Sequence, residues 1–251
     1  MNEPLDYSLI AEDYAKRPAY AKAAIEETLN LANLKTNAKI ADIGAGTGRL
    51  SRQLAEAGYR VMAIEPEDSM RFKGMELTQH LEKITWQEGT AEETGLGQDY
   101  DLVIFGSSFH CVDRELALRE ADNILKPGGF FACLWNHRDF NDPLQAKLEE
   151  FLLNFLGGFG YGVSRQDQSQ VIQDSGLFTN TQRVNKTEVH SLSVDDFMAF
   201  WRSHAILKRG AGPQWEVCLK TIERLVRAEK KDPIDIPFVT RGWVARKVAE
   251  N

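Results

Sequence analysis

The stretch from Asp42 to Gly48 could bring bare backbone against a bound ligand. It reads Asp-Ile-Gly-Ala-Gly-Thr-Gly, and glycine lets a chain turn sharply and approach a ligand without a Cβ in the way. Glu65 stands 21 residues after Gly44. At that spacing an acidic side chain can accept hydrogen bonds from the ribose hydroxyls of an adenosine-containing cofactor. The pattern therefore predicts an adenosine cofactor.

The glycine spacing disfavours a nicotinamide dinucleotide. The dinucleotide fingerprint is G-x-G-x-x-G, whereas this chain has G-x-G-x-G, with Arg49 where the third glycine of the fingerprint would stand. Asp42 would repel a pyrophosphate but suits a ligand that carries cationic groups. A nicotinamide-dependent oxidoreductase stays the alternative enzyme class, although no Tyr-x-x-x-Lys pair supports it.

Alternating strands and helices are needed to position these residues. Apolar runs bounded by glycine predict short strands, and amphipathic stretches between them predict helices, including 20–34 and 49–57. Strands are expected at 39–43, 60–64, 84–86, 101–105 and 129–135. This alternation indicates parallel βαβ units and a doubly wound sheet over residues 38–136.

The second half of the chain has a different pattern. Helices are expected at 143–156, 194–202 and 213–228, and strands at 178–189 and 236–248. A glycine-rich stretch lies at Gly157–Gly160. These elements predict additional strands at the sheet edge together with a cap. The stretches that differ most from the core, including 157–162, are expected to shape the acceptor pocket.

Composition excludes several classes of protein. The 30 Lys and Arg against 37 Asp and Glu give a net charge of −7, which disfavours a nucleic-acid partner. Three widely spaced cysteines fit neither a disulfide framework nor a CxxC metal site, and they are expected to be reduced and buried. The longest apolar run is too short to span a bilayer, and the first residues lack signal-peptide features. We therefore expect a cytoplasmic protein without a metal or membrane partner.

Five segments of the chain together resemble class I S-adenosylmethionine-dependent methyltransferases, and they occur in the expected order. The segments are Ile40–Gly48, Ile64–Pro66, Thr90–Glu92, Tyr100–Ile104 and Leu125–Gly129. The resemblance implies an α/β fold: a Rossmann-like, doubly wound, mostly parallel seven-stranded sheet with helices on both faces and a C-terminal helical cap. It also implies S-adenosyl-L-methionine as cofactor and S-adenosyl-L-homocysteine as product.

The same resemblance assigns roles around the cofactor. It implies that the three glycines pass under the methionine part, that Glu65 holds the ribose and that Met70 packs on the adenine. It implies that Gly106 offers its carbonyl to the cofactor ammonium, and that Tyr14 and Arg17 close over the site. The full set expected at the cofactor is Tyr14, Arg17, Asp42, Gly44, Ala45, Gly46, Gly48, Glu65, Pro66, Met70, Ala91, Glu92, Gly106 and Ser107.

A closer resemblance is to small-molecule methyltransferases related to trans-aconitate methyltransferase. These often carry His-Trp after the fourth strand, whereas this chain has His110-Cys111, a departure that bears on the shape of the acceptor pocket. His110 is the expected catalytic residue. The expected substrate-binding residues are Trp135, His137, Arg138 and His204.

The roles of two of these residues are open. His110 could act as a base towards a hydroxyl or amine, whereas a carboxylate acceptor needs no base; it could also merely line the site, cap a helix or bond a backbone carbonyl. Arg138 could hold an anionic substrate bidentately, or it could form a surface ion pair with Asp139 or Asp142.

The sequence thus predicts methyl transfer to a small-molecule acceptor. O-methylation of a carboxylate or hydroxyl, in secondary or carboxylic-acid metabolism, is the leading hypothesis; N- or C-methylation is the alternative. A small cationic cavity would favour a polycarboxylate, and a large apolar one a polyketide or terpenoid. We expect one domain over 1–251, with N-terminal closing helices (1–37), a cofactor-binding core (38–136) and a sheet edge with substrate cap (137–251).

Overall fold

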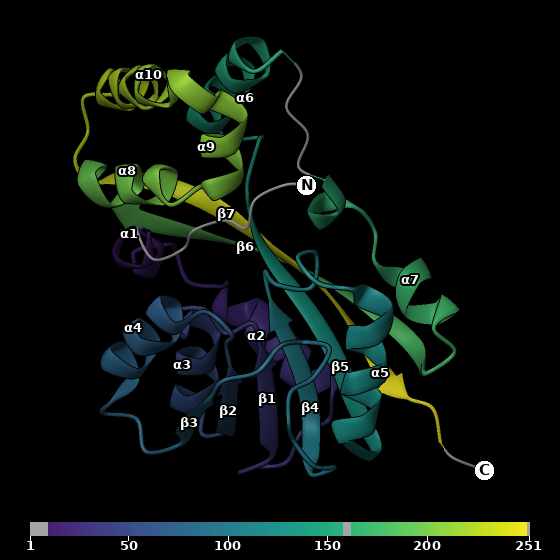
Figure 1. The fold of residues 1–251 in the computed structure, drawn as a ribbon. Coiled ribbons are helices and arrows are strands. Elements are labelled where there is room, and N and C mark those ends of the chain that lie inside the picture. Colours follow the sequence, from purple (N-terminus) through teal and green to yellow (C-terminus); the bar gives the residue numbers. More distant parts are fainter. Residues whose placement is uncertain (1–9, 158–161, 250–251) are drawn as a thin grey trace.

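A computed structural model describes residues 10–157 and 162–249, which fold around one mixed sheet (Figure 1). Among these residues the sheet has seven strands in the order β3-β2-β1-β4-β5-β7-β6. The strands are β1 (Lys39–Ile43), β2 (Arg60–Ile64), β3 (Ile84–Gln87), β4 (Tyr100–Gly106), β5 (Leu125–Arg138), β6 (Phe178–Leu192) and β7 (Ile234–Lys247). This is the fold of class I methyltransferases, as expected.

Three helices begin at a side-chain cap. Asp113, Asp142 and Ser193 each accept a backbone N–H of the first turn of the helix that follows, which satisfies a donor that has no partner within the helix. The helices are α1 (Ala11–Ala15), α2 (Lys22–Leu31), α3 (Arg49–Glu56), α4 (Asp68–Thr78), α5 (Arg114–Ile124), α6 (Pro143–Phe155), η1 (Gly162–Arg165), α7 (Ser169–Asp174), α8 (Val194–Arg202), α9 (Ala205–Ala211), η2 (Gly212–Gln214) and α10 (Trp215–Arg227).

The strand order fixes where a ligand can bind. Strands β1 to β5 pair in parallel, and β7 runs antiparallel to both β5 and β6. The chain moves outward from β1 through β2 to β3, then returns to place β4 on the other side of β1. Ligands of open α/β sheets bind at the carboxyl ends of the strands beside such a reversal, here the ends of β1 and β4.

Two apolar layers cover the faces of the sheet. Helices α2 and α3 bury Ile25, Leu29 and Leu54 against one face. On the other face α5 and α7 bury residues such as Leu118 and Ile172. Because burial of one such side chain contributes about 1.5–3 kcal/mol, these layers hold the carboxyl ends of β1 and β4 in place.

A third apolar cluster belongs to a helical cap. Helices α6, α8, α9 and α10 pack on one another and on the start of β7, burying Trp201, Leu148, Ile222 and Phe238 among others. Figure 1 shows this cap above the carboxyl ends of the central strands, around the upper parts of β6 and β7. The cap therefore lies over the edge at which ligands bind.

Some elements differ from their sequence predictions. β5 runs to Arg138 rather than ending at Trp135, because β7 pairs with it as far as Phe238 opposite Arg138. The helix predicted over 213–228 starts as the short η2 and becomes α-helical at Trp215. In the glycine-rich stretch, residues 158–161 lie outside the described part of the chain.

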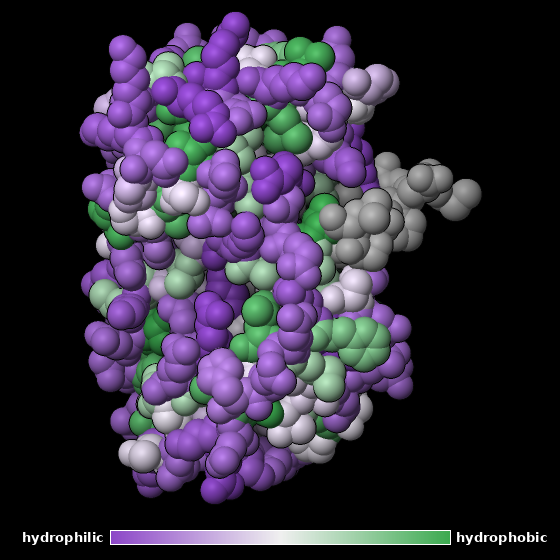
Figure 2. All heavy atoms as spheres, turned by 90° about the vertical axis from the view of Figure 1, so that its left-hand side faces the viewer, coloured by the Kyte–Doolittle hydropathy of each residue, from purple (hydrophilic) through white to green (hydrophobic). Residues whose placement is uncertain are grey.

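The surface is polar on the face shown in Figure 2, where hydrophobic residues occur in small separate groups among hydrophilic ones. Within residues 10–157 and 162–249, helices fall short of the length and apolarity needed to cross a membrane.

Candidate active site

The glycine loop places backbone N–H groups and an acid side by side. Gly44 and Gly46 have φ of +66° and +60°, and a Cβ on Gly44 would lie 2.6 Å from Cβ of Ser108. The Gly46 N–H donates to Glu65 Oε2 at 2.7 Å, and the Glu67 N–H donates to Glu65 Oε1 at 3.0 Å. Burial raises the pKa of Glu65, and these backbone hydrogen bonds oppose the shift. The remaining lone pairs of its carboxylate can accept from ribose hydroxyls.

A cavity of about 440 Å³ extends from this loop. It runs past Met70 to Ala91 and Glu92. Nine of the residues predicted at the cofactor line it, namely Tyr14, Gly44, Gly46, Glu65, Pro66, Met70, Ala91, Glu92 and Ser107. The glycines of the loop, which bring bare backbone to the cavity, and Glu65 beside them fit an adenosine cofactor. We therefore refer to this space as the cofactor cavity.

Five residues predicted at the cofactor lie outside the lining of this cavity. Asp42 is fully buried and accepts from Ser51 Oγ at 2.6 Å, and its pKa is raised to about 7, mainly by burial. Gly48 is the residue before α3, and a Cβ on it would lie 2.8 Å from the Trp86 ring. A Cβ on Gly106 would meet Leu50 and the Tyr20 hydroxyl. Ala45 is a loop residue whose N–H donates to Ile64 O. Arg17 lines a different cavity.

That second cavity, of about 170 Å³, adjoins the first. The two share Tyr14, Ser107 and Cys111 as lining residues. All residues predicted for catalysis and substrate binding come together here: His110, Trp135, His137, Arg138 and His204. We refer to this space as the acceptor cavity, because it meets the cofactor cavity at one end.

His110 is held in one orientation by Trp135. The indole Nε1–H donates to His110 Nδ1 at 3.0 Å. Since indole is a donor only, Nδ1 must be the unprotonated nitrogen, and in the neutral ring the proton is on Nε2. Burial lowers the His110 pKa, which favours this neutral form. Nε2, 3.5 Å from Cys111 Sγ, therefore presents a donor rather than a basic lone pair.

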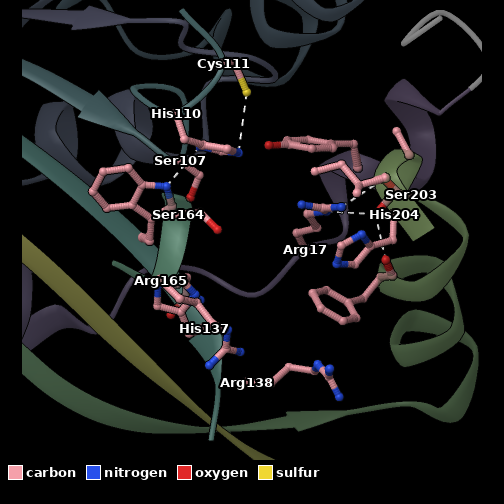
Figure 3. A pocket seen from close by; sticks show the side chains of 16 residues that line it. Arg17, Ser107, His110, Cys111, His137, Arg138, Ser164, Arg165, Ser203 and His204 are labelled. Atoms are coloured by element: carbon pink, nitrogen blue, oxygen red, sulfur yellow. Dashed lines mark hydrogen bonds between the residues drawn. The ribbon is translucent and has the colours of Figure 1, made fainter. Parts of the chain in front are cut away.

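Three arginines give the acceptor cavity its charge. Arg17, Arg138 and Arg165 all line it, from the segment after α1, from the end of β5 and from η1. Figure 3 shows Arg165, His137 and Arg138 together at one end, away from Cys111. Because guanidinium groups stay protonated and match carboxylate geometry, this end suits an anionic group.

Each arginine is held by its neighbours. Arg138 is buried and pairs with Glu149 Oε2 at 2.5 Å, so the surface ion pair considered with Asp139 or Asp142 is not the one formed. Arg17 donates to Ser203 Oγ and to its carbonyl, both at 2.8 Å. The Arg165 guanidinium lies 4.2 Å from the centroid of the Phe140 ring.

The two further histidines of the acceptor cavity are neutral. Burial, followed by the nearby Arg165 and Arg241, lowers the pKa of His137 to about 3. Burial lowers the pKa of His204 well below its usual value, with smaller contributions from Arg17, Arg138 and Arg165. The positive charge therefore resides on the arginines, and the histidines contribute hydrogen-bonding groups.

Helix α1 joins the two halves of the site. Its Asp13 accepts both guanidinium N–H groups of Arg202 in α8 at 2.8 Å, and Glu12 pairs with Lys73 of α4 at 2.7 Å. Tyr14, the residue that follows these two acids, lines both cavities. The N-terminal segment thus bridges the core and the cap, although whether it moves over a bound cofactor stays a prediction.

Sequence reasoning missed part of the acceptor cavity. Ser164, Arg165 and Phe200 line it, and no motif marks the first two, because they follow the glycine-rich stretch in a segment without a clear period. Phe200 is buried in the apolar cluster of the cap and also lines the cavity. Cys111 was expected to be buried, but it is exposed and lines both cavities. Its place between His110 and Val112, just after β4, was the available signal.

The known proteins that this chain resembles are methyltransferases. A family model described as a methyltransferase domain matches residues 41–133. An uncharacterised methyltransferase of Schizosaccharomyces pombe is 27% identical over 96% of both chains. An uncharacterised methyltransferase of Mycobacterium tuberculosis is 36% identical, over 49% of this chain and 48% of its own. The nicotinamide alternative is therefore set aside.

A solved structure has the same fold. A phosphoethanolamine N-methyltransferase of Haemonchus contortus, in complex with phosphomonomethylethanolamine and S-adenosylhomocysteine, superposes with a TM-score of 0.55 at 13% identity. It covers 96% of this chain, which spans 57% of that one. The match concerns the fold; the closer resemblance to trans-aconitate methyltransferase stays a prediction.

Proposed function

We propose that this chain, acting as a class I S-adenosylmethionine-dependent methyltransferase, methylates a carboxylate oxygen of a small organic acid. When bound, the cofactor supplies an activated methyl group. The observation that carries the proposal is the acceptor cavity: about 170 Å³ of space lined by the three arginines Arg17, Arg138 and Arg165, of which Arg138 is paired with Glu149. A cavity of this size and charge favours a polycarboxylate over a polyketide or terpenoid, and disfavours a cationic amine.

The protonation of the histidines supports a carboxylate rather than a hydroxyl acceptor. A hydroxyl of high pKa needs a base, and an effective base has a pKa near the working pH. His137, with a pKa of about 3, is too weak a base, and the lone pair of His110 is engaged by Trp135. A carboxylate needs no deprotonation, so this site matches it.

The residues then have distinct tasks. The arginine end of the cavity binds one anionic group of the substrate, and this leaves a second carboxylate near His110 and Cys111, where the two cavities meet. The Nε2–H of His110 orients that carboxylate as a hydrogen-bond donor. Alignment of acceptor and methyl group can supply up to about 7–11 kcal/mol of the acceleration. A cytoplasmic location and a single domain over 1–251 are part of this proposal.

The test is transfer of labelled methyl to a panel of small acids. The panel contains mono-, di- and tricarboxylates, with phenols and amines of similar size as comparison. We expect label in a dicarboxylate or tricarboxylate, and its release as volatile methanol after mild alkali, because esters hydrolyse whereas methyl ethers and methylamines do not. Alkali-stable label with every acceptor that reacts would overturn the carboxylate proposal.

A further inference from the structure

The cofactor cavity has an unusual charge balance for its ligand. Its charged lining residues, among those that the structure describes, are acids: Glu65, Glu67 and Glu92. They suit the ribose and a cationic cofactor. S-adenosylmethionine also carries a carboxylate at its methionine end, and an anion near three acids requires donors or positive charge from another part of the protein.

Such a charge lies behind the glycine loop. Arg49, the first residue of α3, is half-buried, and its guanidinium forms no ion pair with any of the described residues. Its guanidinium carbon lies 4.7 Å from the centroid of the Tyr20 ring and 5.9 Å from that of Tyr14. Its Nε has no hydrogen-bond partner in the described structure. Asp42 is near enough to interact electrostatically with this guanidinium, but the two form no ion pair, so the guanidinium keeps positive potential at the neighbouring tyrosines.

A directed chain of hydrogen bonds connects Arg49 to the cavity. Arg49 Nη2 donates to the Tyr20 hydroxyl at 3.1 Å, and that hydroxyl lies 2.9 Å from Ser107 Oγ. Arginine can only donate. Tyr20 is buried, and leaving its own O–H unbonded would cost about 1–3 kcal/mol, so the Tyr20 hydroxyl donates to Ser107 Oγ. Burial raises the Tyr20 pKa, which keeps this proton in place.

The direction of the chain determines what Ser107 can do. Its oxygen accepts from Tyr20, so its own hydroxyl hydrogen is available to a ligand. Ser107 lines both cavities (Figure 3). Its backbone is fixed at a φ of +62°, and its N–H donates to Leu134 O at 2.7 Å.

We propose that Ser107 donates a hydrogen bond to the carboxylate of the bound cofactor, and that Tyr20 and Arg49 are positioning residues that orient and polarise this hydroxyl. The resemblance to class I methyltransferases implies that Gly44 and Gly46 lie under the methionine part of the cofactor, and both line the same cavity as Ser107. The carboxylate thus binds to an oriented hydroxyl backed by the Arg49 guanidinium instead of forming an ion pair. This inference concerns the cofactor alone and does not depend on the acceptor.

Two ligands that differ only in the carboxylate separate its contribution to binding from that of the rest of the cofactor. Calorimetric Kd values are measured for S-adenosylhomocysteine and for its decarboxylated analogue, which keeps the ammonium and lacks the carboxylate. In Ser107→Ala we expect the Kd of S-adenosylhomocysteine to rise about tenfold or more, as for loss of a hydrogen bond to a charged group. The Kd of the analogue stays within about twofold. Ser107→Gly gives the same pattern while relaxing the positive φ, which separates the hydroxyl from backbone strain.

Tyr20→Phe tests the chain behind Ser107. The ring and its packing stay, and the oriented donor is lost, so the affinity for S-adenosylhomocysteine falls about threefold to tenfold with little change for the analogue. Tyr100→Phe, at the far end of β4, is the matched control and changes neither Kd. If Tyr20→Phe weakens the binding of both ligands equally, or the binding of neither, the proposal is wrong. Thermal unfolding of each variant is measured to check that it is folded.

Discussion

The cofactor cavity and the acceptor cavity meet at Ser107 and Cys111, yet they are built in opposite ways. The described charged residues lining the first are acids, and its glycine loop and Glu65 lie in consecutive βα units. The second is lined by three arginines from three distant segments. The difference shows that residues close in the sequence can build the cofactor cavity. The acceptor cavity, in contrast, is assembled by tertiary structure from residues far apart in the chain.

The largest expected effect tests the cofactor side. In Gly46→Val the new side chain would have a φ of +60°, which β-branched residues avoid, and it would extend into space bounded by Met70 Cε at 3.5 Å and Tyr14 Cε1 at 3.6 Å from the Cβ. We expect calorimetry to show binding of S-adenosylhomocysteine weakened by about 100-fold or more, since the change combines strain with steric exclusion. Gly97→Val, where a Cβ meets nothing within 4 Å, is the control; retained binding in Gly46→Val would refute the cofactor assignment.

An intermediate effect is expected on the acceptor side alone. Arg165→Gln removes a charge from the cavity while leaving the core untouched, so the KM of a carboxylate acceptor should rise about tenfold, as expected for a charged hydrogen bond. The Kd of S-adenosylhomocysteine should be unchanged. Arg224→Gln, on the exposed face of α10, serves as control. Equal effects on KM and on cofactor binding would contradict the division into two regions.

The smallest effect concerns the pH dependence of stability. The folded-state pKa of His137 is about 3, below its unfolded value of about 6.5. The unfolded state therefore takes up a proton first, and the free energy of unfolding decreases as the pH falls from about 6.5 towards 3, by up to about 1.4 kcal/mol per pH unit from this group. Urea titrations at pH 7, 6 and 5 should show a shallower decrease in His137→Gln.

The exposed His80 provides the matched comparison. His80→Gln should keep the wild-type pH dependence, because an exposed imidazole is solvated in both states. A His137→Gln variant with the wild-type slope would show that this end of the acceptor cavity is open to water, unlike the closed environment that the arginines and aromatic rings indicate.

Much of the cofactor side could be predicted from sequence because its signals are local. The strand, glycine loop, helix and terminal acid follow one another within 27 residues, from Lys39 to Glu65, and each has a physical signature in its own segment. Arg49 was read only as a missing glycine. Its contact with Tyr20 spans 29 positions, and no periodic pattern indicates it.

The acceptor side was predicted less completely. Arg138 and His204 were named, but the sequence could not choose Glu149 as the partner of Arg138 or place Arg165 beside them. The role of His110 as base or donor depended on one bond from Trp135, 25 positions away. Such bonds form only when β5 is placed beside β4.

The sequence by itself determined the class of the protein and its cofactor, since an adenosine is recognised by backbone conformation and by an acid at fixed spacing. Tertiary structure alone decided the sign of charge in the acceptor cavity and the protonation of its histidines. Although the chain has a net charge of −7, it still places three arginines in the lining of the acceptor cavity. Electrostatic potential depends on distance and burial, and these are properties of the folded chain.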